Sequence, residues 1–160
     1  MTLWADINIY VTVSRQSEVT REITLHVRDH CLCLHAQRAA RALARRFDEA
    51  FRPLGLTNGQ FSLMMSLNQP EPPTIGAVAK FLAMDRTTLT AALKPLERRG
   101  LLEVAIDSRD RRARRMKLTP AGRTLLATAV PIWRDTHAEI DRMLPEGDPD
   151  RLRRALSTLS

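Results

Sequence analysis

The sequence predicts a mostly α-helical fold that carries one small β-hairpin. Apolar residues recur every three or four positions over 29–54 and again over 120–143, which is the spacing of amphipathic helices. Residues 102–106 and 116–118 instead alternate between apolar and polar side chains around a charged segment, as in a hairpin. Residues that commonly cap helices stand before the other helical stretches, at Thr57, Thr74, Asp85 and Thr119.

Length and charge limit the possible classes of protein. A chain of 160 residues can bury one good core, so we expect one domain. The net charge of +7 favours an anionic partner, and nucleic acid, an acidic protein and a membrane surface all qualify. The sequence shows neither a bilayer-spanning apolar run nor the order of a secretion signal, so we expect a cytoplasmic protein without a membrane partner.

Residues 1–28 have a strand-like pattern that the rest of the chain lacks. Apolar residues alternate from Ile7 to Val13 and again at Ile23, Leu25 and Val27. This pattern favours a hairpin or an extended arm. We expect it to be peripheral and separate from the domain over 29–160.

Residues 29–54 form the first predicted helix, with arginines between its apolar positions. Pro53 and Gly55 are expected to end it. Thr57 and Gln60 then form a capping box that opens a short helix. Apolar residues surround that helix nearly completely, so we expect it to be central and buried: Phe61, Leu63, Met64, Met65 and Leu67.

Two helices are predicted to begin after Thr74 and Asp85. The first should direct three side chains toward the core: Val78, Phe81 and Leu82. The second should end at Gly100, which can adopt the left-handed conformation common after helices, and Pro95 should bend it. Its apolar stripe consists of Leu89, Leu93 and Leu96.

The opposite side of this second helix combines hydroxyl groups with long cationic side chains. Such a mixture suits a helix in the major groove of DNA, where it can contact base edges and phosphates. The candidate DNA-binding residues are Arg86, Thr87, Thr88, Thr90, Lys94 and Arg98. The alternative is an ordinary solvated face.

The tip of the predicted hairpin, DSRDRRARR, is strongly basic. Its arginines repel one another unless a polyanion is bound, and a narrow minor groove is a suitable partner. Asp107 and Asp110 are placed to order some of them by ion pairing. The candidate DNA contacts are Arg109, Arg111, Arg112 and Arg114, and the alternative is a solvated charged loop.

A long helix is predicted from Thr119–Pro120 through Met143, with a kink at Pro131. A last helix begins at Asp148–Pro149 and carries Leu152, Leu156 and Leu159 in register. These helices and residues 29–54 carry more apolar surface than one small domain can cover, which favours a second chain as their cover.

No arrangement typical of an enzyme or a cofactor site is present in the sequence. It contains no HExxH motif and no glycine-rich phosphate loop, and His26, His30, His35 and His137 are scattered. Cys31 and Cys33 fit neither a disulfide framework nor a four-ligand zinc site, so we expect reduced thiols and no metal. We therefore predict neither catalysis nor a cofactor.

Several segments resemble the MarR family of winged-helix transcription regulators. They are TIGAVA at 74–79, DRTTLT at 85–90, LERRGL at 96–101, DSRDRR at 107–112 and LTPAG at 118–122. The resemblance covers residue 29 to the C-terminus. It implies a DNA-binding winged helix over 57–119, flanked by dimerisation helices over 29–54 and 120–160. It also implies a homodimer on pseudo-palindromic double-stranded DNA, most simply as a repressor.

The resemblance leaves the regulatory signal open between a small aromatic ligand and cysteine oxidation. For a ligand, the candidate lining is Cys33, Gln37, Phe61, Met64, Met65 and Trp133. Cys33 matches the reactive cysteine of the branch that senses organic hydroperoxides, but the two tyrosines of that branch correspond to Gln37 and Phe47 here. Both thiols could instead simply pack in an interface. A non-sensing architectural DNA binder or a protein-binding winged helix is the alternative of another class.

Overall fold

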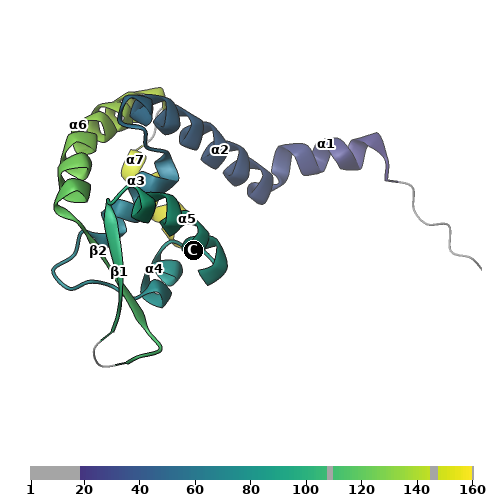
Figure 1. The fold of residues 1–160 in the computed structure, drawn as a ribbon. Helices are drawn as coiled ribbons and strands as arrows, with labels where there is room; N and C mark the ends of the chain where they lie inside the picture. The colour runs from purple at the N-terminus through teal and green to yellow at the C-terminus, as the bar shows by residue number, and fades with distance from the viewer. Residues whose placement is uncertain (1–18, 108–109, 145–147, 160) are drawn as a thin grey trace, which may run out of the picture. The chain divides into compact units, whose positions relative to one another are not determined.

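The computed structural model describes residues 19–107, 110–144 and 148–159. Contacts divide the chain into two compact units, Met1–Ala39 and Ala40–Ser160, and each is described by itself. The order of elements is helical up to the β-hairpin and helical again after it (Figure 1). Within the described ranges, no helix has both the length and the apolar character to cross a membrane.

The first unit contains helix α1, Arg21–His30, where the sequence pattern favoured an extended arm. That expectation is wrong for these residues, and the part of it that falls on residues 1–18 lies outside the described residues. Thr20 caps α1 by accepting from the Ile23 amide at 3.3 Å. Ile23 and Val27 are four residues apart, so the same alternation also places them on one face of a helix. Ile23 and Val27 therefore fit an amphipathic helix as well as a strand.

Helix α2, Leu32–Phe51, starts after a break at Cys31, whose backbone is extended. The predicted helix over 29–54 is therefore interrupted near its start. Phe47 and Phe51 are buried in the second unit. A 3-10 helix, η1 (Arg52–Leu54), follows, and Gly55 ends it with a φ of 61°.

Helix α3, Asn58–Leu67, lies at the centre of the second unit, as predicted. Its capping box is present: the Gln60 amide donates to the Thr57 hydroxyl, and the Gln60 side chain accepts from the Thr57 amide. The buried α3 residues join a single apolar core with residues from α2, α4, α5, both strands and α6. Among the α3 residues that we expected to be buried, Met65 is the exception, since 41% of it is exposed.

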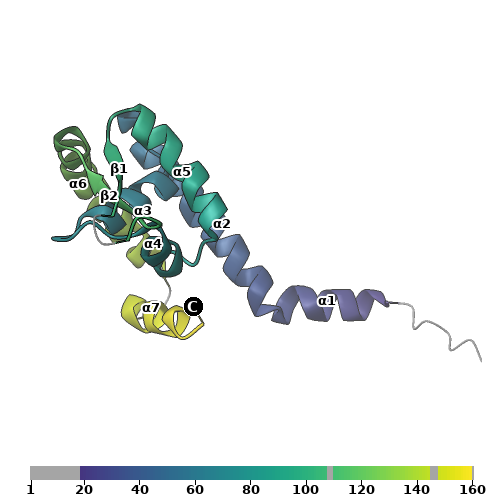
Figure 2. The same ribbon diagram turned by 60° about the horizontal axis from the view of Figure 1, so that its bottom comes forward.

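Helices α4 (Ile75–Phe81) and α5 (Arg86–Arg98) pack against each other, and α5 also contacts β1 (Figures 1 and 2). Leu89, Leu93 and Leu96 are buried, as their spacing predicts. Phe81 was expected to point inward, but it is 76% exposed. The inward positions of α4 are Val78 and Ala79. A helix turns about 100° per residue, so Phe81 lies only about 60° from Val78 but about 160° from Ala79, beyond the edge of the inward face.

Strands β1 (Leu102–Ile106) and β2 (Arg114–Leu118) form the predicted antiparallel hairpin. Leu102 pairs with Leu118 and Val104 pairs with Met116, so the apolar positions share one face. Met116 and Leu118 are buried, whereas Ile106 at the far end is 58% exposed. The hairpin thus packs on the core at its base and leaves it toward the tip (Figure 1).

Helix α6, Pro120–Met143, starts at the predicted Thr119 cap and remains one helix through Pro131. Its first turn lies against the end of α5: the Thr119 hydroxyl donates to the Gly100 carbonyl at 2.7 Å, and Gly122 faces the Leu101 carbonyl. A Cβ on Gly122 would lie 1.9 Å from that oxygen. Close contact between backbones therefore requires glycine in the LTPAG segment.

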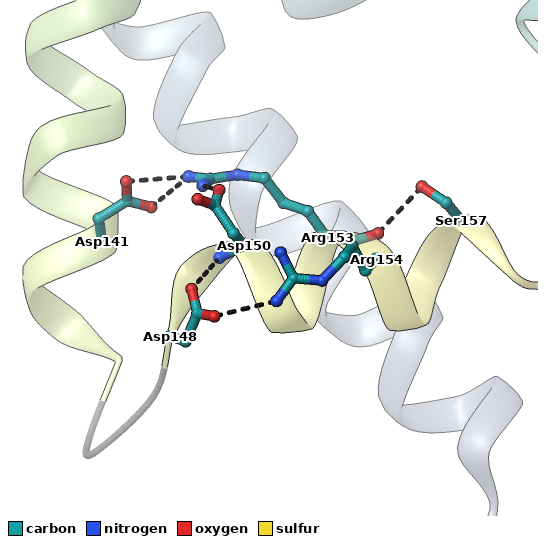
Figure 3. Close-up of polar contacts among 6 residues, drawn as sticks. All are labelled: Asp141, Asp148, Asp150, Arg153, Arg154 and Ser157. Carbon is teal, nitrogen blue, oxygen red and sulfur yellow. Dashed lines mark hydrogen bonds and ion pairs between the residues drawn. The ribbon is translucent and has the colours of Figure 1, made fainter.

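Helix α7, Pro149–Ser157, has no buried residue. Figure 3 shows the ion pairs that attach it to α6 and stabilise its first turn. Arg153 donates to both carboxylate oxygens of Asp141, at 2.6 and 2.9 Å, and to Asp150 at 2.6 Å. Arg154 donates to Asp148 at 3.0 Å. Polar contacts therefore hold α7 while its leucines stay exposed.

Candidate nucleic-acid interface

Helix α5 is fixed at both ends, so its outward side chains have defined positions. At its start, Asp85 accepts from the Thr88 amide at 2.8 Å and from the Thr88 hydroxyl at 2.5 Å. The Thr88 hydrogen bonds lower the pKa of the Asp85 carboxyl below its ordinary value. At the other end Gly100 has the predicted left-handed φ of 67°, and Arg99 donates to the Gly55 carbonyl at 2.6 Å.

The three threonines of α5 that we expected to contact DNA differ in their free hydrogen-bonding groups. The Thr88 hydroxyl donates to Asp85, and the Thr90 hydroxyl donates to the Arg86 carbonyl at 2.7 Å. Both therefore offer only acceptor positions to a partner. The Thr87 side chain makes no hydrogen bond within the described part of the chain, so it can both donate and accept. Sequence reasoning had no means of separating them.

The described part of the wing, the loop between β1 and β2, is organised around Asp107, whose side chain is 4% exposed. Asp107 accepts from Arg115 in an ion pair and from the Asp110 amide at 3.0 Å. Arg115 also donates to the Pro72 carbonyl at 2.7 Å, and the Met116 amide donates to the Pro73 carbonyl at 3.0 Å. Arg115 is therefore a residue that joins the hairpin to the segment before α4, a role that the sequence did not reveal.

A basic groove lies between α4, α5 and the wing. One hollow of about 540 Å³ is lined by residues of all three, including Arg86, Thr90, Arg112 and Arg114. A second hollow of about 450 Å³ shares Ile75, Thr90 and Arg114 with the first and adds Lys94. Cations from the helix and from the wing therefore face one continuous depression, which is a suitable shape and charge for a phosphate backbone.

The remaining predicted DNA contacts lie outside these two hollows. Arg98 is exposed in the last turn of α5, and Arg111 is exposed in the wing. Thr87 and Thr88 are exposed in the first turn of α5. Arg109 lies outside the described residues.

A separate, apolar depression lies between α3, α4 and α6, and its volume is about 490 Å³. We call it the lateral groove. Three of the predicted ligand-contacting residues meet there: Phe61, Met65 and Trp133. Met64 does not line it, because it is fully buried in the core. The structure adds residues that sequence reasoning missed, namely Ser62, Ser66, Gln69, Phe81, Leu82 and Val130.

The other two predicted sensing residues, Cys33 and Gln37, belong to the first unit. The Gln37 side-chain amide donates to the Cys33 sulfur at 3.1 Å, and Cys33 is exposed. Cys31 occupies the break between α1 and α2, where its sulfur accepts from the Leu34 amide at 3.4 Å. The two thiols therefore have different surroundings despite lying two residues apart.

His137 lies next to a row of aromatic rings on the core side of α6. Its ring is 5.0 Å from that of Phe47 and 4.5 Å from that of Trp133. Its Nδ1 atom is buried without a hydrogen-bond partner among the described residues. Partial burial, and to a lesser degree the charge of Arg153, lowers the pKa of His137 below 6.5. Among the described residues, no three His, Cys, Asp or Glu side chains are grouped to hold a metal ion.

Comparison with known proteins gives a consistent result. The model of the MarR family matches residues 56–113, which include α3, α4, α5, β1 and most of the wing. The crystal structure of the Mycobacterium tuberculosis transcriptional regulator MosR in complex with DNA is 40% identical, with a TM-score of 0.74; the similarity covers 81% of this chain and 92% of that one. The transcriptional repressor CouR bound to a 23-mer DNA duplex is 28% identical, with a TM-score of 0.68. That similarity covers 84% of this chain and 94% of the CouR chain.

Similarity to a curated protein is more local. The transcriptional activatory protein BadR of Rhodopseudomonas palustris is 35% identical over 72 residues. That match spans 43% of this chain and 41% of BadR, so the chain covers less than half of that relative.

Proposed function

Because this chain belongs to the MarR family, whose members are transcription regulators and not enzymes, we propose that it is a dimeric, sequence-specific repressor that a small aromatic ligand releases from DNA. The observation that carries the DNA-binding part is the basic groove, since its cations come from both α5 and the wing. Two elements that present charge to one depression can bind a single duplex along its backbone.

Within this groove we propose different roles for the helix and the wing. The cations Arg86, Arg112 and Arg114 contact phosphates and supply affinity that depends on salt. Thr87 contacts base edges, since it has a hydroxyl with no partner in the described chain and lies at the start of the helix that enters the major groove. Lys94 and Arg98 continue the helix contacts, and Arg109 and Arg111 extend those of the wing.

Exposed apolar side chains on the terminal helices support a homodimer. Leu152 and Leu156 on α7 are 46% and 47% exposed, Leu159 just after the helix is 65% exposed, and no residue of α7 is buried. In the first unit, Ile23 and Val27 form a similar exposed pair on α1. A second copy of the chain would cover these faces, and two-fold symmetry then requires a pseudo-palindromic operator.

The DNA-binding proposal is tested by fluorescence anisotropy with the protein's own promoter fragment and a shuffled duplex of equal length. At physiological salt we expect at least about a thousandfold preference for the promoter. Equal affinity for both duplexes would contradict sequence-specific regulation and favour an architectural DNA binder. No affinity for either duplex would favour a protein-binding winged helix.

Paired substitutions test the division of roles. Arg112→Ala should weaken binding to every duplex and reduce the salt-dependence slope by about 0.9, which corresponds to one phosphate contact. Thr87→Ala should instead reduce the preference for the promoter at unchanged slope. Arg134→Ala removes an exposed cation on α6, outside the groove, and should change neither quantity. Similar effects from Arg112→Ala and Thr87→Ala would contradict the assignment.

Repression and dimerisation have separate tests. A reporter gene behind the bound promoter should be expressed more strongly when the regulator is deleted, whereas lower expression would identify an activator.

Sedimentation should give a dimer that Leu156→Glu converts to monomer, because the substitution places a charge in the proposed apolar interface. A wild-type monomer at micromolar concentration would exclude the dimer.

A second candidate signal is oxidation of Cys33. The supporting observation is that this thiol is exposed and accepts a hydrogen bond from Gln37 at 3.1 Å. An exposed thiol is accessible to a peroxide, and exposure is one of the conditions for its oxidation. Treatment with an organic hydroperoxide should then weaken operator binding in the wild type and not in Cys33→Ser, with Cys31→Ser as the control. Unchanged wild-type affinity would exclude this route.

A further inference from the structure

We propose that His26 and His30 on helix α1 form a chelating pair that binds one divalent transition-metal ion. The site lies within the first unit of the chain, and it does not depend on the proposed DNA-binding function. Three observations support the inference: the spacing of the two histidines, a hydrogen bond that orients the His30 ring, and the charges around the pair.

The spacing of the pair suits two ligands of one ion. His26 and His30 are exposed and lie four residues apart on α1, so they share one side of the helix, about 6 Å apart along its axis. Their rings already face each other, with centroids 4.2 Å apart and an angle of 24° between the planes. Two metal–nitrogen bonds of about 2.0–2.1 Å at a tetrahedral angle place the nitrogens about 3.4 Å apart. Rotation of these exposed side chains can therefore bring both rings onto one ion.

A hydrogen bond to the backbone orients the His30 ring for metal binding. Its Nδ1 atom lies 2.9 Å from the His26 carbonyl oxygen. A carbonyl can only accept, so Nδ1 carries the proton, and in the neutral ring Nε2 has the free lone pair. Metal-binding histidines commonly donate their other ring nitrogen in this way, which fixes the ring and makes the ligand more basic. The ring nitrogens of His26 make no hydrogen bond within the part of the chain that the structure describes, so they too can bind an ion.

The charges around the pair favour a cation. His30 is the last residue of α1, and the carbonyl end of a helix attracts positive charge. Glu22 lies four residues before His26, on the same side of the helix, and adds a negative charge. Arg28 stands between the two histidines in sequence, but it donates to both carboxylate oxygens of Asp29, at 2.6 and 2.9 Å. That ion pair balances the positive charge of Arg28, so a metal ion meets little repulsion.

The pair supplies two protein ligands, and water fills the other coordination positions. A third protein ligand is absent among the described residues, where no three His, Cys, Asp or Glu side chains are grouped. The nearby sulfur atoms have other partners: Cys31 accepts from the Leu34 amide at 3.4 Å, and Cys33 accepts from Gln37 at 3.1 Å. The expectation of no metal came from four-ligand motifs, whereas a helical pair needs only the spacing. Because its ligands lie one turn apart, a bound ion stabilises the last turn of α1.

The test is calorimetric titration of the full chain, without an affinity tag and with its thiols reduced. We expect one Ni²⁺ per chain, weaker binding of Co²⁺, and no binding of Mg²⁺, which prefers oxygen ligands. Loss of an outer partner of a metal ligand alone weakens affinity about 10–100-fold, so His26→Ala and His30→Ala should each weaken Ni²⁺ binding at least about tenfold. His35→Ala removes an exposed histidine of the same unit and is the matched control, with unchanged Ni²⁺ affinity. Ni²⁺ should also increase the helical circular dichroism of the wild type and not of His30→Ala.

The absorption spectrum of the Co²⁺ complex distinguishes the histidine pair from the thiols. A Co²⁺–thiolate bond gives a charge-transfer band in the near ultraviolet, which Co²⁺ bound by imidazole and water lacks. That band, or loss of Ni²⁺ binding in Cys31→Ser or Cys33→Ser, would place the ion on the thiols and overturn the inference. Unchanged Ni²⁺ affinity in His26→Ala or His30→Ala would also overturn it, as would an equal loss in His35→Ala or no saturable Ni²⁺ binding by the wild type.

Discussion

Gly122 provides a direct test of how closely α6 approaches the end of α5. A Cβ added at this position would lie 1.9 Å from the Leu101 carbonyl oxygen, whereas real Cβ atoms essentially never come closer than 3.0 Å. The backbones must therefore separate by at least 1.1 Å, the difference between those two distances. The same Leu101 oxygen accepts from the Thr119 amide at 3.1 Å, so the shift also strains the hydrogen bond at the start of α6.

We expect Gly122→Ala to destabilise the protein by about 2 kcal/mol. Overpacking of this kind costs about 1–3 kcal/mol. A weakened hydrogen bond adds about 0.5–1.5 kcal/mol. The better helix propensity of alanine offsets at most about 1 kcal/mol of this cost. For a domain of this size, the midpoint of thermal unfolding should fall by about 4–8 °C.

The matched control is Gly59→Ala, which makes the same chemical change in the first turn of another helix. A Cβ on Gly59 would meet nothing within 4 Å. Removing glycine from a helix should then stabilise the protein by about 0.5–1 kcal/mol. Thermal and urea unfolding, followed by circular dichroism, should give shifts of opposite sign for the two variants. Shifts of the same sign and size would refute the close contact at Leu101.

Three further predictions concern the turn before α5, the wing and pH. Ala83→Gly should stabilise the protein by up to about 1 kcal/mol because it relieves a left-handed alanine. The control, Ala77→Gly inside α4, should destabilise it by about 1 kcal/mol. Urea unfolding measures the sign of both changes in the free energy of unfolding. Arg115→Met should cost about 3 kcal/mol because it removes the ion pair of the buried Asp107 carboxylate. Lys117→Met, which breaks an exposed pair with Glu103, should cost under about 1 kcal/mol. Equal losses in urea unfolding would contradict a special role for Arg115. His137 has a lowered pKa in the folded state, so the unfolded chain binds more protons and stability should fall as pH drops below 6.5. His137→Phe should show a weaker fall than the wild type between about pH 7.5 and about pH 5.5 in urea unfolding, and identical pH dependence would exclude the effect.

The sequence by itself determined the local signals of this fold. Thr57, Thr74, Asp85 and Thr119 cap helices where the sequence predicts, because a cap depends only on residues up to three positions away. The alternation in β1 and β2 likewise fixed which side chains share a face of the hairpin. The basic charge of α5 and of the wing could also be identified from the sequence, because each is carried by residues that are close together in the chain.

Where several residues fit the same sequence pattern, only the tertiary structure decided what surrounds each of them. Ile23 and Val27 fit a strand and a helix equally, and Phe81 fits the inward spacing of α4 although Val78 and Ala79 occupy that side. Arg114 and Arg115 are adjacent in a run of arginines, yet Arg114 lines the basic groove while Arg115 pairs with Asp107. The lateral groove combines α3, α4 and α6, whose residues lie up to about 70 positions apart. Such contacts depend on how the elements pack, and no pattern confined to a few neighbouring residues encodes them.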